Sequence, residues 1–157
     1  MTTPRWLLRW GHASDYRSVA DVMFDAVRNG RSRYTEEQRA AWVPAPRSGP
    51  EWDQRLGSQD VILAEAEGDI VGFMSLAPGG YIDFAYIRPS AQGTGLFRLL
   101  YEQLLQRARE NSERRLWVHA SLMAQPAFRA LGFVVVCDET VLIGDQAFDR
   151  SEMELEL

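Results

Sequence analysis

The stretch SAQGTGLFRLLYEQLL, residues 90–105, places two glycines at the start of an amphipathic helix. Apolar residues follow at helical spacing, at Leu96, Leu99, Leu100, Leu104 and Ala108. The first turn of a helix has N–H groups without intrahelical partners, and the aligned peptide dipoles make that end positive. Gly93 and Gly95 therefore either let a phosphate approach these N–H groups or supply only the dihedral angles of a tight turn.

Two common phosphate-binding loops are excluded by the residues that follow the glycines. A P-loop has Lys and then Ser or Thr after its last glycine, whereas Leu96 and Phe97 follow Gly95. A dinucleotide-binding fingerprint requires a glycine at the position that Arg98 occupies. Neither of these nucleotide-binding folds fits the sequence.

The segments around this stretch predict an α/β fold with one mixed sheet of six to seven strands, flanked by helices. Before the stretch, turns at Gly68-Asp69 and at Pro78-Gly79-Gly80 separate three apolar runs, which indicates a largely antiparallel meander. These predicted strands cover 61–66, 70–77 and 81–87. After the stretch, LWVHA is predicted to be a strand, so strand, helix and strand form a parallel crossover. A short helix over 124–131 and the strand FVVVCD follow, and TVLI or MELEL supplies the last strand.

The N-terminal third is predicted to be helical after a first strand over 6–10. Val19, Val22, Met23, Ala26 and Val27 share one face of a helix. Asn29-Gly30 is expected to end that helix with a left-handed residue. Thr35 and Gln38 have the spacing of a capping box, and Ser48 and Glu51 repeat that spacing before a further short helix.

Length and charge limit the classes of function. The 157 residues, 46% of them hydrophobic, predict a single domain over 1–157. With 22 acidic and 17 basic side chains, the net charge of −5 argues against a nucleic-acid partner. No membrane-spanning segment or signal peptide is expected, so the predicted location is cytoplasmic. The single cysteine, Cys137, excludes an internal disulfide and is expected to be a buried, inert thiol. The histidines and carboxylates show no metal-ligand spacing, so no metal is predicted.

Two blocks of residues resemble the GNAT superfamily of acetyl-CoA-dependent N-acetyltransferases. The first is IRP at 87–89 with QGTGLF at 92–97, which is similar to the family's phosphate motif, [Q/R]-x-x-G-x-[G/A], after a strand. The second runs from Val118 to Val136 and is similar to the family's C-terminal segment. Its matching positions are Ser121, Ala124, Phe128 and Gly132-Phe133. The order of strands and helices also resembles the family along nearly the whole chain.

The resemblance implies where the acyl donor, acetyl-CoA, binds. In such proteins the strand before the phosphate loop diverges from its neighbour, and the pantetheine arm lies in the gap as an added strand would. The expected contacts to acetyl-CoA are made by Tyr86, Ile87, Arg88, Gln92, Gly93, Thr94, Gly95, Leu96, Phe97, Ser121 and Phe128.

Two positions depart from the family pattern. Phe97 stands where the phosphate motif usually ends in Gly or Ala, so its ring either points away from the phosphates or weakens CoA binding. Phe128 stands where the family usually has a tyrosine that acts as general acid, and phenylalanine has no proton to give. Ser121, a water molecule or unassisted departure of the thiolate remain as alternatives.

The general base has two candidates. Asp83 lies in the middle of YIDFAYI, where a carboxylate must be paired, exposed or functional. His119 lies two residues before Ser121 on a predicted strand, so both side chains face one side, and imidazole suits proton transfer near neutrality. A structural role is the alternative for both. Tyr34, Trp42 and Trp52 are expected either to line an acceptor pocket or to pack the helices onto the sheet.

These observations together predict an N-acetyltransferase that moves an acetyl group from acetyl-CoA to a primary amine of a small molecule or peptide. The alternative, suggested by Phe97 and Phe128, is a catalytically weak protein that binds or senses acyl-CoA. Because family members often form homodimers, the resemblance also makes a homodimer a possible state of this protein.

Overall fold

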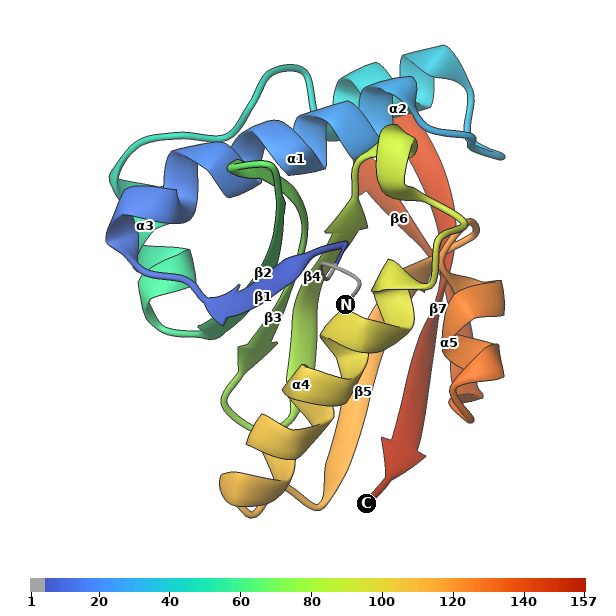
Figure 1. Ribbon diagram of the computed structural model, residues 1–157. Coiled ribbons are helices and arrows are strands. Elements are labelled where there is room, and N and C mark those ends of the chain that lie inside the picture. Colours follow the sequence, from blue (N-terminus) through green and yellow to red (C-terminus); the bar gives the residue numbers. More distant parts are fainter. Residues whose placement is uncertain (1–4) are drawn as a thin grey trace.

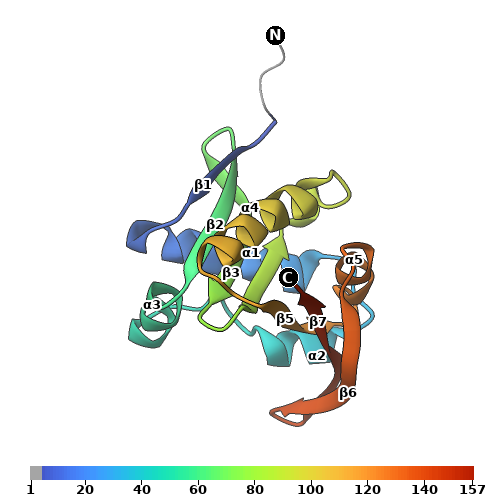
Figure 2. The same ribbon diagram turned by 90° about the horizontal axis from the view of Figure 1, so that it is seen from below.

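The computed structural model describes residues 5–157 and contains a seven-stranded sheet with helices on both faces (Figure 1). The strand order is β1-β2-β3-β4-β5-β7-β6, with β1 and β6 at opposite edges (Figure 2). The strands are β1 (Leu7–Trp10), β2 (Asp60–Ala66), β3 (Asp69–Ala77), β4 (Tyr81–Ile87), β5 (Arg115–Ser121), β6 (Val134–Ile143) and β7 (Gln146–Glu156). The helices are α1 (Tyr16–Asn29), α2 (Glu36–Trp42), α3 (Pro50–Gly57), α4 (Leu96–Glu110) and α5 (Gln125–Ala130), with short 3-10 turns η1 (Ala13–Asp15) and η2 (Pro89–Ala91). The predicted mixed, largely antiparallel sheet is confirmed.

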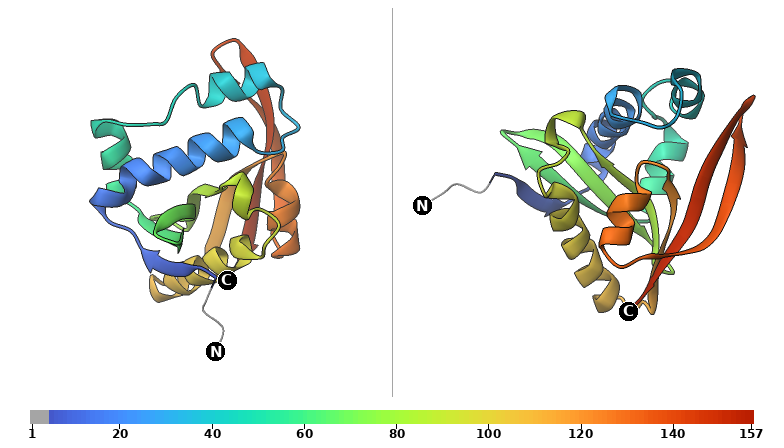
Figure 3. Two further views of the ribbon diagram at one scale, coloured as in Figure 1. Left: turned by 45° about the horizontal axis from the view of Figure 1, so that its top comes forward. Right: turned by 90° about the vertical axis from the view of Figure 1, so that its right-hand side faces the viewer.

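The helices cover the two faces of the sheet separately, so the molecule has two apolar cores (Figure 3). On one face α4 buries Leu96, Leu100 and Leu104 completely against the sheet. On the other face α1 buries Val19 and Val22 in the same way, together with residues of α3. The apolar residues whose spacing predicted both helices therefore form the faces that pack against the sheet.

The pair β4 and β5 is the only parallel pair among the described strands, and it is short. Tyr81 pairs with Trp117 and Ile82 pairs with Val118, and no further residues of the two strands are in register. Antiparallel pairing with β3 matches Leu76 to Ile82 but Ser75 to Phe84, so Asp83 is an extra residue in β4. The predicted crossover is confirmed, and beyond its first two pairs the strands separate and leave a gap in the sheet.

Two helix ends differ from the prediction for identifiable reasons. Gly30 has φ −77° and ψ 166°, so it is extended and not left-handed. A Cβ there would lie 2.5 Å from the Ala26 carbonyl oxygen, so glycine is needed for close approach. Gly49, not Ser48, is the N-cap of α3, because Pro50 occupies the first helical position.

The N-cap of α2 agrees with the prediction and allows a matched test. Thr35 Oγ1 accepts from the Gln38 N–H at 3.1 Å, and Gln38 Oε1 accepts from the Thr35 N–H at 2.7 Å. Replacing Thr35 by alanine removes a cap, so we expect the free energy of unfolding to fall by about 1 kcal/mol. The control, Ser48→Ala, removes a hydroxyl that caps nothing and should change it by less than about 0.5 kcal/mol. Urea denaturation measures both, and equal losses would contradict the assignment of the caps.

The C-terminal hairpin corrects two further predictions. FVVVCD and TVLI are not separate strands, because β6 runs from Val134 to Ile143 and pairs with β7 along its length. Since β6 is the edge strand and most of its residues are exposed, Cys137 is an exposed free thiol and the prediction that it is buried was wrong. Within residues 5–157, no helix is both long enough and apolar enough to cross a membrane.

Candidate active site

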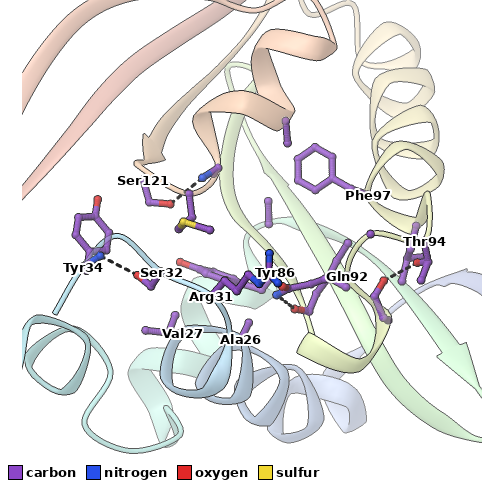
Figure 4. Close-up of a pocket in the computed structure, with 18 of the residues that line it drawn as sticks. Ala26, Val27, Arg31, Ser32, Tyr34, Tyr86, Gln92, Thr94, Phe97 and Ser121 are labelled. Atoms are coloured by element: carbon purple, nitrogen blue, oxygen red, sulfur yellow. Dashed lines mark hydrogen bonds between the residues drawn. The ribbon is translucent and has the colours of Figure 1, made fainter. Parts of the chain in front are cut away.

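A cleft of about 400 Å³ opens where β4 and β5 separate (Figure 4). Five parts of the chain form its walls: the end of α1 with the following loop, the end of α2, the end of β4, the loop that leads into α4, and the segment from β5 to α5. The residues that line it are Ala26, Val27, Arg31, Ser32, Tyr34, Trp42, Ala85, Tyr86, Ile87, Ala91, Gln92, Gly93, Thr94, Gly95, Leu96, Phe97, Ser121, Met123, Ala124 and Ala127. Except for Arg31, none of them carries a full charge.

The loop before α4, which we call the glycine loop (residues 92–95), forms one wall. Gly93 has φ +71° and Gly95, the N-cap of α4, has φ +88°, so both adopt the left-handed region that favours glycine. A Cβ on either residue would meet no atom within 4 Å. The first-turn N–H groups of α4 thus adjoin open space, and no acidic side chain occupies that turn. The two roles considered for the glycines, a tight turn and a phosphate-binding loop, are therefore compatible. The left-handed dihedral angles require glycine, and glycine leaves the loop without side chains at these two positions.

The end of β4 directs backbone groups without a strand partner into the gap. Arg88 donates its backbone N–H to the Val71 carbonyl of β3 at 2.8 Å. Successive residues of a strand direct their backbone groups to opposite edges, so Ala85 and Ile87 direct theirs away from β3. The Ile87 carbonyl accordingly accepts from Gln92 Nε2 at 3.0 Å. An extended ligand in the gap can therefore pair with this strand as a further strand would.

The Phe97 ring packs toward α5 and away from the glycine loop (Figure 4). Its centroid lies 5.3 Å from that of Phe128, with the two planes at 81°. Phe128 is only 1% exposed and also packs edge-on against Phe133. The large residue at the end of the phosphate motif is thus accommodated by an aromatic side chain at the position of the usual tyrosine.

His119 of β5 is at the centre of a polar cluster with residues of β4, β6 and β7. The Tyr81 hydroxyl and His119 Nδ1 lie 2.8 Å apart in a hydrogen bond. His119 Nε2 lies 3.7 Å from Glu139 and 3.8 Å from Glu152, and the histidine side chain is 23% exposed. Ser121 lines the cleft two residues farther along β5, and its Oγ accepts from the Ala124 N–H at 3.3 Å.

The Asp83 carboxylate accepts hydrogen bonds from two side chains. It accepts from Arg55 at 2.8 and 2.7 Å and from Gln59 Nε2 at 2.6 Å. The Asp83 side chain is 7% exposed, whereas that of Arg55 is 46% exposed. This arrangement neutralises the carboxylate at the bulge in β4 and ties α3 to that strand.

Three tyrosines near the cleft keep their protons near neutral pH. Burial raises the pKa of the Tyr86 phenol, which faces the cleft from β4. Burial also raises the pKa of Tyr34, whose hydroxyl donates to the Asp149 carbonyl at 2.6 Å. The pKa of Tyr81 is raised by burial and next by the negative charge of Asp83. The Tyr81 phenol can therefore act as a hydrogen-bond donor to His119.

The residues proposed from the sequence fall into two groups by position. The predicted donor contacts that line the cleft are Tyr86, Ile87, Gln92, Gly93, Thr94, Gly95, Leu96, Phe97 and Ser121. Arg88 instead pairs with Asp25 at 3.0 Å and donates to the Ile70 carbonyl, and Phe128 lies behind Phe97. Asp83 and His119 lie outside the cleft lining, in the polar groups described above.

The cleft is also lined by residues that the sequence did not single out. Arg31 and Ser32 come from a loop with no motif, and Met123 lies in the C-terminal block at a position that matches no motif residue, so only the structure brings them to the cleft. Tyr34 and Trp42 line the cleft. One of the two roles expected for them was to line an acceptor pocket. Trp52 is buried against Phe84 and lies elsewhere. Among residues 5–157 no three His, Cys, Asp or Glu side chains are grouped as metal ligands.

Comparisons with known proteins identify relatives of the whole chain. The acetyltransferase (GNAT) domain family matches residues 31–156. An uncharacterized N-acetyltransferase of Escherichia coli K12, YafP, is 29% identical over 128 residues, which are 81% of this chain and 80% of the relative. The crystal structure of a GCN5-related N-acetyltransferase from Rhodopseudomonas palustris has a TM-score of 0.90 and 27% identity, covering 100% of this chain and 99% of that one. A phosphinothricin acetyltransferase from Sinorhizobium meliloti, solved in complex with acetyl-CoA, has a TM-score of 0.74 and 21% identity, covering 98% and 89%.

Proposed function

Because the chain belongs to the acetyltransferase (GNAT) family, we propose that it transfers an acetyl group from acetyl-CoA to a primary amine of a small molecule or peptide. The observation that carries this proposal is the cleft between β4 and β5, with a bare helix N-terminus at one end and unpaired strand groups along one wall. A diphosphate fits the first feature and an amide-containing pantetheine arm fits the second.

The donor contacts follow from this arrangement. The N–H groups from Gly93 to Phe97 hold the diphosphate, and Ala85 and Ile87 pair with the pantetheine amides. The thioester then lies deeper in the gap, between β4 and Ser121. The N–H of Ala85, which points away from β3 and lies farther into the gap than Ile87, is the donor that we assign to the oxyanion.

Transfer requires one proton to leave the amine nitrogen and one to reach the sulfur. The neutral amine attacks the thioester carbonyl carbon and forms the C–N bond, after which the C–S bond breaks and the thiolate leaves. We assign proton uptake from the amine to His119 Nδ1 through the Tyr81 hydroxyl, which donates to that nitrogen and passes its hydrogen on as it takes the amine proton. The carboxylates of Glu139 and Glu152 lie near Nε2 and stabilise the resulting imidazolium. The Ser121 hydroxyl is our candidate donor to the thiolate, because its oxygen accepts from Ala124 and its hydrogen remains available.

Acetyl-CoA is expected to stabilise the fold. At a concentration one hundred times its Kd, linkage requires about 2.7 kcal/mol of added stability, or roughly 5–10 °C in Tm for a chain of this length. Thermal unfolding with and without acetyl-CoA measures this, and a thiol assay with a panel of primary amines measures CoA release. An unchanged Tm at that excess would contradict donor binding.

The alternative is a module that binds or senses acyl-CoA without efficient transfer. It is favoured by one observation, the buried Phe128 at the position of the usual proton donor. Stabilisation by acetyl-CoA without CoA release from any amine of the panel would support it. Restored release in Phe128→Tyr would show that only the proton donor is missing.

A further inference from the structure

Arg31 is the single charged residue among the described residues that line the cleft. It follows α1 after Gly30 and lies beside the start of the glycine loop. The other lining residues are apolar, or polar without charge, so a negative group drawn into this cleft meets one full positive charge. A buried anion without a countercharge is costly, so this cation is the decisive electrostatic feature of the cleft.

The Arg31 side chain is not committed to a structural interaction. It is exposed, and within residues 5–157 it makes no ion pair or side-chain hydrogen bond. Three other arginines near this end of the cleft differ in this respect. Arg28 donates to the Val43 carbonyl, Arg39 to the Gly30 carbonyl, and Arg88 pairs with Asp25. Arg31 is therefore free to bind a ligand without breaking an internal contact.

The local backbone holds Arg31 close to the glycine loop. A Cβ on Gly30 would lie 3.3 Å from Gln92 Nε2, so the end of α1 and the first residue of the loop are in direct contact. Gly30 itself is buried, and its extended conformation directs the chain along the rim of the cleft. The Arg31 side chain extends along the cleft toward Gln92 (Figure 4).

The glycine loop lacks a basic side chain of its own. Residues 89–97 contain no Lys or Arg, and Arg88, which precedes them, is paired. The loop therefore offers a diphosphate only N–H groups and the helix dipole, which amount to a partial charge. A guanidinium with forked donors is the side chain best suited to supply the remaining charge to phosphate oxygens.

We propose that Arg31 binds the diphosphate of the acyl donor from the α1–α2 loop, which adjoins Gln92 at the start of the glycine loop, so that the anion is held between this side chain and the N-terminus of α4. This inference rests on the proposed function, because it takes acetyl-CoA as the ligand. It adds a contact from a segment outside the phosphate motif, in the loop whose residues Ser32 and Tyr34 also line the cleft.

The test is isothermal titration calorimetry of wild type, Arg31→Ala, Arg31→Lys and Arg33→Ala with three donors. The donors are acetyl-CoA, its 3′-dephospho form and S-acetylpantetheine, which lacks the diphosphate; the last is measured by competition if it binds weakly. Arg33→Ala is the matched control, because it removes the same charge from the same exposed loop but does not line the cleft. The Tm of each variant without ligand is measured to show that the fold is intact.

Arg31→Ala is expected to raise the Kd of acetyl-CoA and of the dephospho form roughly tenfold or more, and to leave that of S-acetylpantetheine unchanged. Arg31→Lys should recover part of the loss, and Arg33→Ala should match wild type. An unchanged Kd for acetyl-CoA in Arg31→Ala would overturn the proposal. It would do so even if the variant raised the KM of a carboxylate-bearing acceptor, because Arg31 would then bind the acceptor and not the donor. A loss confined to acetyl-CoA would overturn it in favour of the 3′-phosphate, and an equal loss with all three donors would overturn it as well. If wild type binds none of the donors, the proposed function itself fails.

Discussion

Gly80→Ala is expected to lower the free energy of unfolding by about 3 kcal/mol or more, enough to unfold a domain of marginal stability. Gly80 has φ +79°, and a Cβ there would lie 1.9 Å from the carbonyl oxygen of Arg115. The obstacle is backbone, so the start of β5 has to move away from the turn before β4. That movement also breaks the hydrogen bond from the Trp117 N–H to the Gly80 carbonyl, which is 3.0 Å long. Urea denaturation followed by circular dichroism measures the loss.

Gly79→Ala is the matched control for Gly80→Ala. Gly79 has a similar φ of +85°, but a Cβ there would meet no atom within 4 Å. Its backbone N–H, which donates to Glu113 at 3.2 Å, is retained in the variant. We therefore expect only the strain of a left-handed alanine, about 1–2 kcal/mol. Equal losses in the two variants would show that the dihedral angle, and not the approach of β5, explains the requirement for glycine at 80.

The close approach at Gly80 is also what makes the cleft possible. The two strands are held together at Gly80 and at the pairs Tyr81–Trp117 and Ile82–Val118, and the bulge at Asp83 follows immediately. A bulge increases local twist and redirects the strand. The gap that accommodates a ligand thus begins where regular pairing ends, beyond the contact at Gly80 and the two strand pairs.

The order of elements could be predicted because each one has a local cause in the sequence. Three apolar runs separated by glycine-containing turns predicted β2, β3 and β4, and leucines at helical spacing predicted α4. The Thr35–Gln38 capping box was predictable for the same reason, since both hydrogen bonds lie within four residues. The Ser48 prediction failed because Pro50 has a stronger positional preference than Ser48.

The walls of the cleft were less predictable because they depend on contacts across the chain. The Tyr34 hydroxyl donates to the Asp149 carbonyl and Gln38 Nε2 donates to the Ala147 carbonyl at 2.6 Å, which attaches the start of α2 to β7. No local pattern in GRSRYT indicates that attachment, so Arg31 could not be assigned to the cleft from sequence. Likewise the bidentate pairing of Asp83 with Arg55 joins residues 28 positions apart and is invisible in YIDFAYI.

His119→Ala is expected to lower kcat/KM for a primary amine by roughly two to four orders of magnitude, the usual contribution of a general base. The variant leaves β5 intact but removes the imidazole that the Tyr81 phenol holds at 2.8 Å and that two carboxylates adjoin. A protonated imidazole cannot accept the amine proton, so the activity of wild type should fall toward acidic pH. In His119→Ala this dependence should disappear, which a pH profile of kcat/KM measured by CoA release will reveal.

Asp83→Asn separates the two base candidates. The carboxylate of Asp83 already accepts three hydrogen bonds, two from Arg55 and one from Gln59, so its loss should act mainly on the fold. We expect the free energy of unfolding to drop by about 1–3 kcal/mol, with kcat/KM less than about tenfold below wild type and an unchanged pH profile. The opposite result, a flat profile in Asp83→Asn and a normal one in His119→Ala, would make Asp83 the base. Wild-type profiles in both variants would exclude both residues and leave solvent water as the acceptor of the amine proton.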